Sequence, residues 1–167
     1  MLEFVKFSEY RPGIIVSLLS RSYAEYFQYD PEREPIWRQI SEDYDRAVFE
    51  YPDTIGACGF ITRLNMQVIG YASWDPRQFP VGLVGGNCIL PEFRGNSYGT
   101  RQIKEVLRVF ESRGFVKARV ITGEHRFFEP ARRMYRACGF REVARGARDD
   151  GAEYKQITYE VDFVAVG

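Results

Sequence analysis

Histidine and cysteine are scarce in this sequence: His125 is the one histidine, and the cysteines are Cys58, Cys88 and Cys138. An odd, widely spaced set of cysteines does not form a disulfide framework, so we expect free, buried thiols in a reducing compartment. Because no Cys-His motif surrounds the histidine, a cysteine nucleophile is disfavoured. We also expect no metal.

The sequence also lacks an excess of positive or negative charge. Lys plus Arg and Asp plus Glu number 23 each, which gives no overall electrostatic signal for nucleic acid or an anionic membrane. The longest apolar run, around 13–19, is far too short to span a bilayer, and residues 1–6 do not resemble a signal peptide. We therefore expect a cytoplasmic protein that binds neither nucleic acid nor membrane.

Hydrophobic residues are plentiful, at 45%, and include eleven Tyr and thirteen Phe. This composition is typical of a folded globular chain. The sequence contains no linker, internal repeat or low-complexity tract. We therefore predict a single domain over residues 1–167.

The first half of the chain predicts helices followed by strands. We expect a strand at 3–7, one helix through 15–26 closed by Asp30-Pro31, a helix from Pro35 with Ile36, Ile40, Ala47 and Val48 on one side, and strands at 55–63, 66–74 and 81–90. Leu64-Asn65 joins two of these strands as a hairpin. Glycines at 82, 85 and 86 indicate a bulge or a close approach in the third.

The second half predicts two helix-Gly-Phe-strand units. Ile103, Val106, Leu107 and Phe110 form a helical core stripe that ends at Gly114, and a strand at 115–122 follows. A helix from Pro130 ends at Gly139, and strands at 141–145 and 153–163 flank the turn Asp149-Asp150-Gly151. The fold class is α/β (α+β): a central, mostly antiparallel mixed sheet of about seven strands, flanked by about four helices on both faces.

The most informative stretch is 89–100, in which a strand, a Gly-bearing turn and a helix follow one another. A turn that leads into a helix N-terminus presents unpaired backbone N–H groups, which suit a pyrophosphate. Gly95 and Gly99 let the backbone approach the phosphates, and Arg94 could add charge or brace the turn. An ordinary strand-helix connection explains the same pattern, whereas the dinucleotide and Walker glycine motifs do not match it.

Two motifs in order make the sequence resemble the GNAT acetyltransferases. One is Pro91-x-x-Arg94-Gly95-x-x-x-Gly99-Thr100, and the other is the helix 131–140, with Ala131, Tyr135, Gly139 and Phe140 in the family's spacing. The resemblance covers about 55–140, and it includes a glycine at position 70. It implies the GNAT fold and acetyl-CoA, or another acyl-CoA, as co-substrate.

The resemblance also implies the site residues. The backbone of Ile89 and Leu90, where the fourth strand splays from the fifth, would bind the pantetheine arm and polarise the thioester carbonyl. Tyr135 would protonate the leaving thiolate. The pyrophosphate loop would consist of Arg94, Gly95, Asn96, Ser97, Tyr98, Gly99 and Thr100.

Two residues depart from the family pattern. Ser97 stands where the family's first loop glycine occurs, and we expect a right-handed backbone there, which a serine adopts without strain. Phe128 stands where the family often has an asparagine that contacts pantetheine. We expect apolar packing to replace that contact.

The general base and the acceptor site are less defined. His125 and Glu124 are candidate bases, although His125 could equally cap or brace its turn. Aromatic side chains could line an acceptor pocket, although core packing explains most of them; they are Tyr23, Tyr26, Phe27, Tyr29, Trp37, Tyr71 and Trp74.

The leading hypothesis is an N-acyltransferase that transfers an acetyl group to a primary amine of a small molecule or peptide by direct attack in a ternary complex. The alternatives are a non-catalytic acyl-CoA-binding regulatory module and an interaction domain without a cofactor. The sequence does not name the amine. A homodimer stays open, because many proteins of this fold pair through edge strands.

Overall fold

The computed structural model describes residues 1–147 and 154–164, which form seven strands and five α-helices. In chain order they are β1 (Leu2–Val5), α1 (Ile14–Ser22), α2 (Ala24–Tyr29), α3 (Glu34–Glu50), β2 (Gly59–Leu64), β3 (Gln67–Asp75), β4 (Val81–Ile89), α4 (Tyr98–Ser112), β5 (Lys117–Gly123), α5 (Glu129–Ala137), β6 (Arg141–Gly146) and β7 (Gln156–Asp162). The predicted turn Asp149-Asp150-Gly151 lies outside the described residues.

The strands form one mixed sheet in the order β1-β2-β3-β4-β5-β7-β6. The registered pairs are antiparallel except β4 with β5, which is parallel and begins at Val81 opposite Lys117. Four of the helices have seven residues or more. The predicted fold class is therefore confirmed.

The chain divides into two compact units, each built from separated segments. One unit comprises 1–73 and 86–102, and the other comprises 74–85 and 103–167. The single domain over residues 1–167 stays a prediction.

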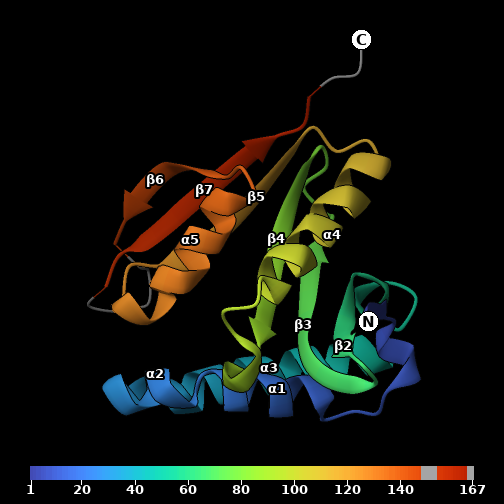
Figure 1. The fold of residues 1–167 in the computed structure, drawn as a ribbon, viewed down its shortest axis with the longest axis vertical. Coiled ribbons are helices and arrows are strands. Elements are labelled where there is room, and N and C mark those ends of the chain that lie inside the picture. Colours follow the sequence, from blue (N-terminus) through green and yellow to red (C-terminus); the bar gives the residue numbers. More distant parts are fainter. Residues whose placement is uncertain (148–153, 165–167) are drawn as a thin grey trace. The chain divides into compact units, whose positions relative to one another are not determined.

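In the first unit, helices α1 and α3 lie side by side (Figure 1). The carboxylate of Asp45 on α3 accepts the backbone N–H groups of Gly13, at 2.8 Å, and Ile15, at 3.0 Å. These are among the N–H groups at the start of α1 that lack an acceptor within the helix, so Asp45 is buried with its hydrogen bonds satisfied. The buried core of this unit comprises Phe7, Ile15, Leu18, Leu19, Val48, Ile61, Tyr71, Cys88 and Leu90.

The helices of this unit differ from the predictions in two respects. The expected single helix is interrupted at Tyr23, whose φ of −104° and ψ of 7° separate α1 from α2. The helix predicted from Pro35 is present as α3, but of the residues predicted to share one side Ile36 and Ile40 are 47% and 53% exposed, whereas Val48 is buried. The buried face is turned toward Ser41, Asp45 and Val48, because Asp45 must reach the start of α1.

The strand predictions are shifted at their ends. Residues Ile55–Ala57 form a 3₁₀ turn instead of the start of a strand. Strand β1 ends at Val5, so Phe7 lies outside it and packs its ring over Gly59, where a β-carbon would lie 2.4 Å from the ring. The hairpin turn predicted at Leu64-Asn65 is centred on Asn65 and Met66, both with positive φ.

In the second unit, Ile103, Val106 and Phe110 of the predicted stripe on α4 are fully buried, and Leu107 is half-buried. The Phe110 ring lies against Gly82 of β4, where a β-carbon would be 2.7 Å from it, so that glycine marks a close approach. Helix α5 lies along β5 and β7 (Figure 1). Among the described residues no helix is long and apolar enough to cross a membrane.

Candidate functional site

The turn before α4 has the geometry of an anion-binding site. The carbonyl oxygen of Ser97 accepts the N–H of Arg101 at 3.1 Å, which places Ser97 at the N-terminal cap of the helix. The N–H groups of Tyr98 and Gly99, in the first turn, have no acceptor within the helix and carry the positive end of its dipole. This arrangement suits a phosphate group.

The turn uses left-handed backbone at two positions. Gly95 has a φ of +82° and Ser97 has a φ of +63°. Our expectation of a right-handed backbone at Ser97 is therefore wrong: the chain needs a left-handed residue there to enter the helix. A serine in this conformation is strained by about 1 kcal/mol relative to glycine. Left-handed residues in a turn help to direct successive N–H groups into an anion-binding concavity.

Two side chains brace the same turn. The Arg94 guanidinium donates from Nε to the Ile89 carbonyl at 3.0 Å and from Nη2 to the Ser22 carbonyl at 2.7 Å. The Asn96 amide donates to the carbonyl oxygens of Phe93, at 3.3 Å, and Arg94, at 3.2 Å. Arg94 therefore braces the turn.

Two backbone groups at the end of β4 face β3. The N–H of Leu90 donates to the Ile69 carbonyl at 2.8 Å. The carbonyl oxygen of Cys88 faces Gly70 of β3, where a β-carbon would lie only 2.1 Å from it. A trans peptide directs its C=O and N–H in opposite directions, so the Ile89 N–H points away from β3.

The Cys88 thiol at this point is buried. Burial raises its pKa to about 11, although Ser22 and the Arg94 charge lower it in part. The thiol therefore stays protonated at neutral pH, which disfavours it as a nucleophile.

Tyr135 lies in the second unit, in the last turn of α5. It is buried, and its ring packs against Phe140, with centroids 5.8 Å apart, and against Tyr159 at 6.3 Å. The neighbouring Arg136 donates to the Tyr159 hydroxyl at 3.3 Å. The predicted tyrosine is thus held by aromatic packing against the segment that follows α5 and against β7.

His125 caps the turn that precedes α5. Its Nδ1 accepts the N–H of Phe127 at 3.0 Å, and its ring stands edge-on to Tyr154, with centroids 4.6 Å apart. A neutral imidazole that accepts at Nδ1 carries its proton on Nε2. Both nitrogens are then unable to accept a substrate proton while the cap persists. The capping role is observed, and the role as a base stays a prediction.

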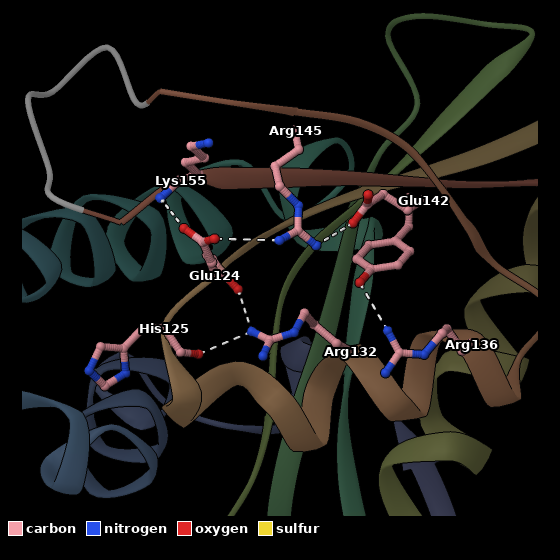
Figure 2. Close-up of polar contacts among 9 residues, drawn as sticks. Glu124, His125, Arg132, Arg136, Glu142, Arg145 and Lys155 are labelled. Atoms are coloured by element: carbon pink, nitrogen blue, oxygen red, sulfur yellow. Dashed lines mark hydrogen bonds and ion pairs between the residues drawn. The ribbon is translucent and has the colours of Figure 1, made fainter.

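The surroundings of His125 are tied together by polar contacts (Figure 2). Arg132 donates to the backbone carbonyl of His125 at 3.0 Å and to that of Gly123 at 2.8 Å. Glu124, the other candidate base, accepts the Lys155 N–H at 3.1 Å and pairs with Arg145 at 3.4 Å. The Glu124 carboxylate therefore joins β5 to the segments around β6 and β7.

Phe128 is buried, and its ring packs against Gly123, where a β-carbon would lie 3.0 Å from it. Apolar packing thus occupies the position where the family often has an asparagine.

The aromatic candidates differ in how deeply they are buried. Tyr71 and Trp74 are core residues, and burial raises the pKa of Tyr71 well above its ordinary value. Tyr23, by contrast, is half-buried, and it contacts Trp37, at a centroid distance of 5.0 Å, and Phe27, at 6.3 Å. Of the remaining two, Tyr26 is buried and Tyr29 is 45% exposed.

The predicted residues thus fall into two sets. The first unit contains Ile89, Leu90 and the turn 94–100, and the second contains Tyr135 and His125. Sequence reasoning missed Gln102, which is fully buried and hydrogen-bonded to Thr62 and to the Cys88 carbonyl. Its signal is a polar residue directly beside the core stripe that begins at Ile103.

Comparison with known proteins points to one family. The model of the acetyltransferase (GNAT) family matches residues 16–140. A protein assigned to that family from Desulfovibrio desulfuricans has a similar structure, with a TM-score of 0.75 and 13% identity over 97% of this chain and 98% of that one. No curated protein matches the sequence.

Two further solved structures are similar. The N-acetyltransferase from Staphylococcus aureus Mu50 has a TM-score of 0.70 and 14% identity over 97% of each chain. The PaiA N-acetyltransferase from Thermoplasma acidophilum, solved with coenzyme A, has a TM-score of 0.65 and 13% identity over 98% of this chain and 99% of that one. At these identities the similarity shows the fold.

Proposed function

Because the chain belongs to the acetyltransferase (GNAT) family of acetyl-CoA-dependent N-acetyltransferases, we propose that it transfers the acetyl group of acetyl-CoA to a primary amine of a small molecule or peptide. The observation that carries this proposal is the braced turn before α4. Its left-handed residues Gly95 and Ser97 lead directly into the helix N-terminus.

The residues of this turn fit the cofactor. The N–H groups from Gly95 to Thr100 bind the pyrophosphate, because they combine the helix dipole with a backbone that phosphates can approach closely. Arg94 acts by bracing, since its guanidinium already donates to two backbone carbonyls. The pantetheine arm runs along the edge of β4 that faces away from β3.

The chemistry requires an oxyanion donor. The neutral amine nitrogen attacks the thioester carbon, and the carbonyl oxygen becomes an oxyanion. The N–H of Leu90 already donates to Ile69, so we assign the oxyanion to the N–H of Ile89. A fixed donor of this kind lowers the barrier because it needs no reorganisation as the charge develops.

Proton transfers complete the reaction. The C–N bond forms, the C–S bond breaks, and the CoA thiolate takes a proton from the Tyr135 hydroxyl. The amine loses its own proton to a base. His125 stays a candidate for that base, and it must release the Phe127 N–H in order to act.

The acceptor site lies beside the end of β4. The Arg94 guanidinium bonds the carbonyls of both Ser22 and Ile89, so the chain at Tyr23 is tied to the end of β4. The half-buried rings of Tyr23, Phe27 and Trp37 then form an apolar wall for the carbon skeleton of the amine.

The strain at Ser97 favours one second candidate, a non-catalytic module that binds acyl-CoA without turnover. Two measurements on wild type and Tyr135→Phe distinguish the enzyme from the module. Calorimetric titration with acetyl-CoA and with CoA measures binding, and release of the CoA thiol in the presence of a library of amines measures turnover. Acetyl-CoA binding with thiol release that is lost in Tyr135→Phe supports the enzyme. Binding without thiol release supports the module, and no binding to the folded protein overturns both.

A further inference from the structure

Gln102 forms a buried bridge between two strands of the first unit. Gln102 and Thr62 are both fully buried, on α4 and β2. The Thr62 hydroxyl donates to Gln102 Oε1 at 2.5 Å, and Gln102 Nε2 donates to the Cys88 carbonyl of β4 at 3.4 Å. This amide orientation is required, because the Cys88 carbonyl can only accept a hydrogen bond.

Gly70 makes room for the bridge. Thr62 and Gly70 are register partners in β2 and β3, and the Cys88 carbonyl faces Gly70 from the other side. A β-carbon at position 70 would lie 2.1 Å from that carbonyl oxygen and 2.9 Å from Ile89 Cδ1. With no side chain at this point, the Gln102 amide can reach from Thr62 to the carbonyl of Cys88.

The bridge acts on one peptide group. The carbonyl that accepts from Gln102 belongs to the Cys88–Ile89 peptide, whose other end is the N–H of Ile89. A peptide is planar, so fixing its carbonyl fixes the direction of its N–H. A donor at the carbonyl also polarises the same peptide and strengthens its N–H as a donor.

We propose that Gln102 is a positioning residue for acetyl transfer. It holds the Cys88–Ile89 peptide so that the Ile89 N–H is aimed at the thioester carbonyl. The inference rests on the proposed function. Thr62 acts one step further out, because its hydroxyl orients the Gln102 amide.

The same residue couples the two ends of the cofactor site. Gln102 lies one turn beyond Tyr98 and Gly99, whose N–H groups bind the pyrophosphate in the proposed function. A helix is rigid over one turn. The Gln102 side chain therefore fixes the position of a thioester at the end of β4 relative to a phosphate bound at the start of α4.

The cost of burying these groups supports a functional reading. A buried amide contributes little net stability even when it is bonded, and replacing both partners by apolar groups of the same shape can be nearly neutral. Helix α4 already buries the apolar side chains of Ile103, Val106 and Phe110. The packing of this helix therefore does not require a polar side chain at position 102.

The test uses acetyl-CoA labelled with ¹³C at the thioester carbonyl as the probe. The carbonyl stretching band is recorded by difference infrared spectroscopy, free and bound to the full chain. Three proteins are compared with wild type: Gln102→Leu, Gln102→Leu combined with Thr62→Val, and Gln39→Leu. Gln39 is exposed on α3 and bonded only to Asp43 among the contacts described for its side chain.

The double variant keeps the test valid if Gln102→Leu alone is unstable. It removes the Thr62 hydroxyl together with the Gln102 amide, so only the Cys88 carbonyl loses a partner, which costs less stability than leaving two buried groups unpaired. Acetyl-CoA affinity is measured in parallel by calorimetry, and unfolding by urea shows that each variant is folded.

In wild type and Gln39→Leu, we expect binding to shift the carbonyl band to lower wavenumber. In both Gln102 variants that shift should fall by about half or more, with acetyl-CoA affinity within about threefold of wild type. With any amine that wild type acetylates, kcat should fall by about 10-fold to 100-fold.

A folded Gln102 variant that binds acetyl-CoA and keeps the full band shift overturns the positioning role and leaves the proposed function intact. A purely structural residue would lower the urea midpoint without moving the band, and that result also overturns it. Absence of acetyl-CoA binding by wild type overturns the proposed function and this inference together.

Discussion

The Arg94 guanidinium donates to the carbonyl oxygen of Ser22 at 2.7 Å. This bond ties the last residue of α1 to the turn that precedes α4, although the two are far apart in sequence. The same guanidinium bonds the Ile89 carbonyl at the end of β4. One side chain thus fixes three segments of the first unit, and its removal should affect all of them.

Arg94→Ala should lower the free energy of unfolding by about 2 kcal/mol, since it removes two charge-assisted bonds to carbonyls and leaves those carbonyls unpaired. Urea unfolding measures the change. Arg101→Ala, an exposed arginine on the first turn of α4, is the matched control and should change stability little. Equal effects of the two variants would show that Arg94 acts as an ordinary surface charge.

Ser97→Gly should raise the free energy of unfolding by about 1 kcal/mol. The φ of +63° is strained for serine and ordinary for glycine. Met66→Gly tests the same principle in the β2–β3 turn, where φ is +70°. An unchanged or lower stability of Ser97→Gly, with a gain in Met66→Gly, would mean that the serine side chain makes a compensating contact.

His125→Asn and His125→Ala separate capping from catalysis. The asparagine side chain places an acceptor near the position of Nδ1 and can accept the Phe127 N–H, whereas alanine cannot. We therefore expect alanine to cost about 1 kcal/mol of stability and asparagine to restore most of it. If asparagine restores stability yet the pH–rate profile loses a limb, His125 is also the base.

Glu160 should make stability depend on acid pH. Burial raises its pKa, but hydrogen bonds from Arg119 at 2.7 Å and Lys117 at 3.2 Å outweigh this, and its pKa lies below the ordinary 4.5. The unfolded chain then binds more protons, so the ionised carboxylate stabilises the fold above pH 4.5. That stability is lost as the pH falls from 4.5 through the lowered pKa.

The measurement is urea unfolding of wild type and Glu160→Gln over a pH series. At neutral pH the variant should be less stable by about 2 kcal/mol, and the difference should narrow in acid. Glu105→Gln, which breaks an exposed ion pair with Arg108, is the control. Its free energy of unfolding should differ little from wild type, and that difference should not narrow in acid. A constant difference for Glu160→Gln across the series would contradict the prediction.

The elements with strong local signals could be predicted from sequence. The stripe through Ile103, Val106 and Phe110 is buried, and Gly114 and Gly139 end their helices with positive φ, as glycine at a helix C-terminus usually does. These features depend on neighbours within one or two turns, which the sequence displays directly.

Features that depend on distant partners could not be predicted. The buried face of α3 follows from Asp45 reaching the start of α1, and nothing in the spacing of Ile36 and Ile40 reveals that partner. The role of Arg94 depends on Ser22, and that of Gln102 on Thr62 and Cys88. In the site, the motif locates the turn, but the sequence does not reveal which N–H groups are already paired.

Cys88 has a practical consequence. Its thiol is buried, with a pKa of about 11, whereas Cys58 and Cys138 are only partly buried. A thiol-specific dye at neutral pH should modify Cys88 at the rate at which the core of the first unit opens. The natural sequence therefore contains its own kinetic reporter of local opening, read by mass spectrometry without an engineered label.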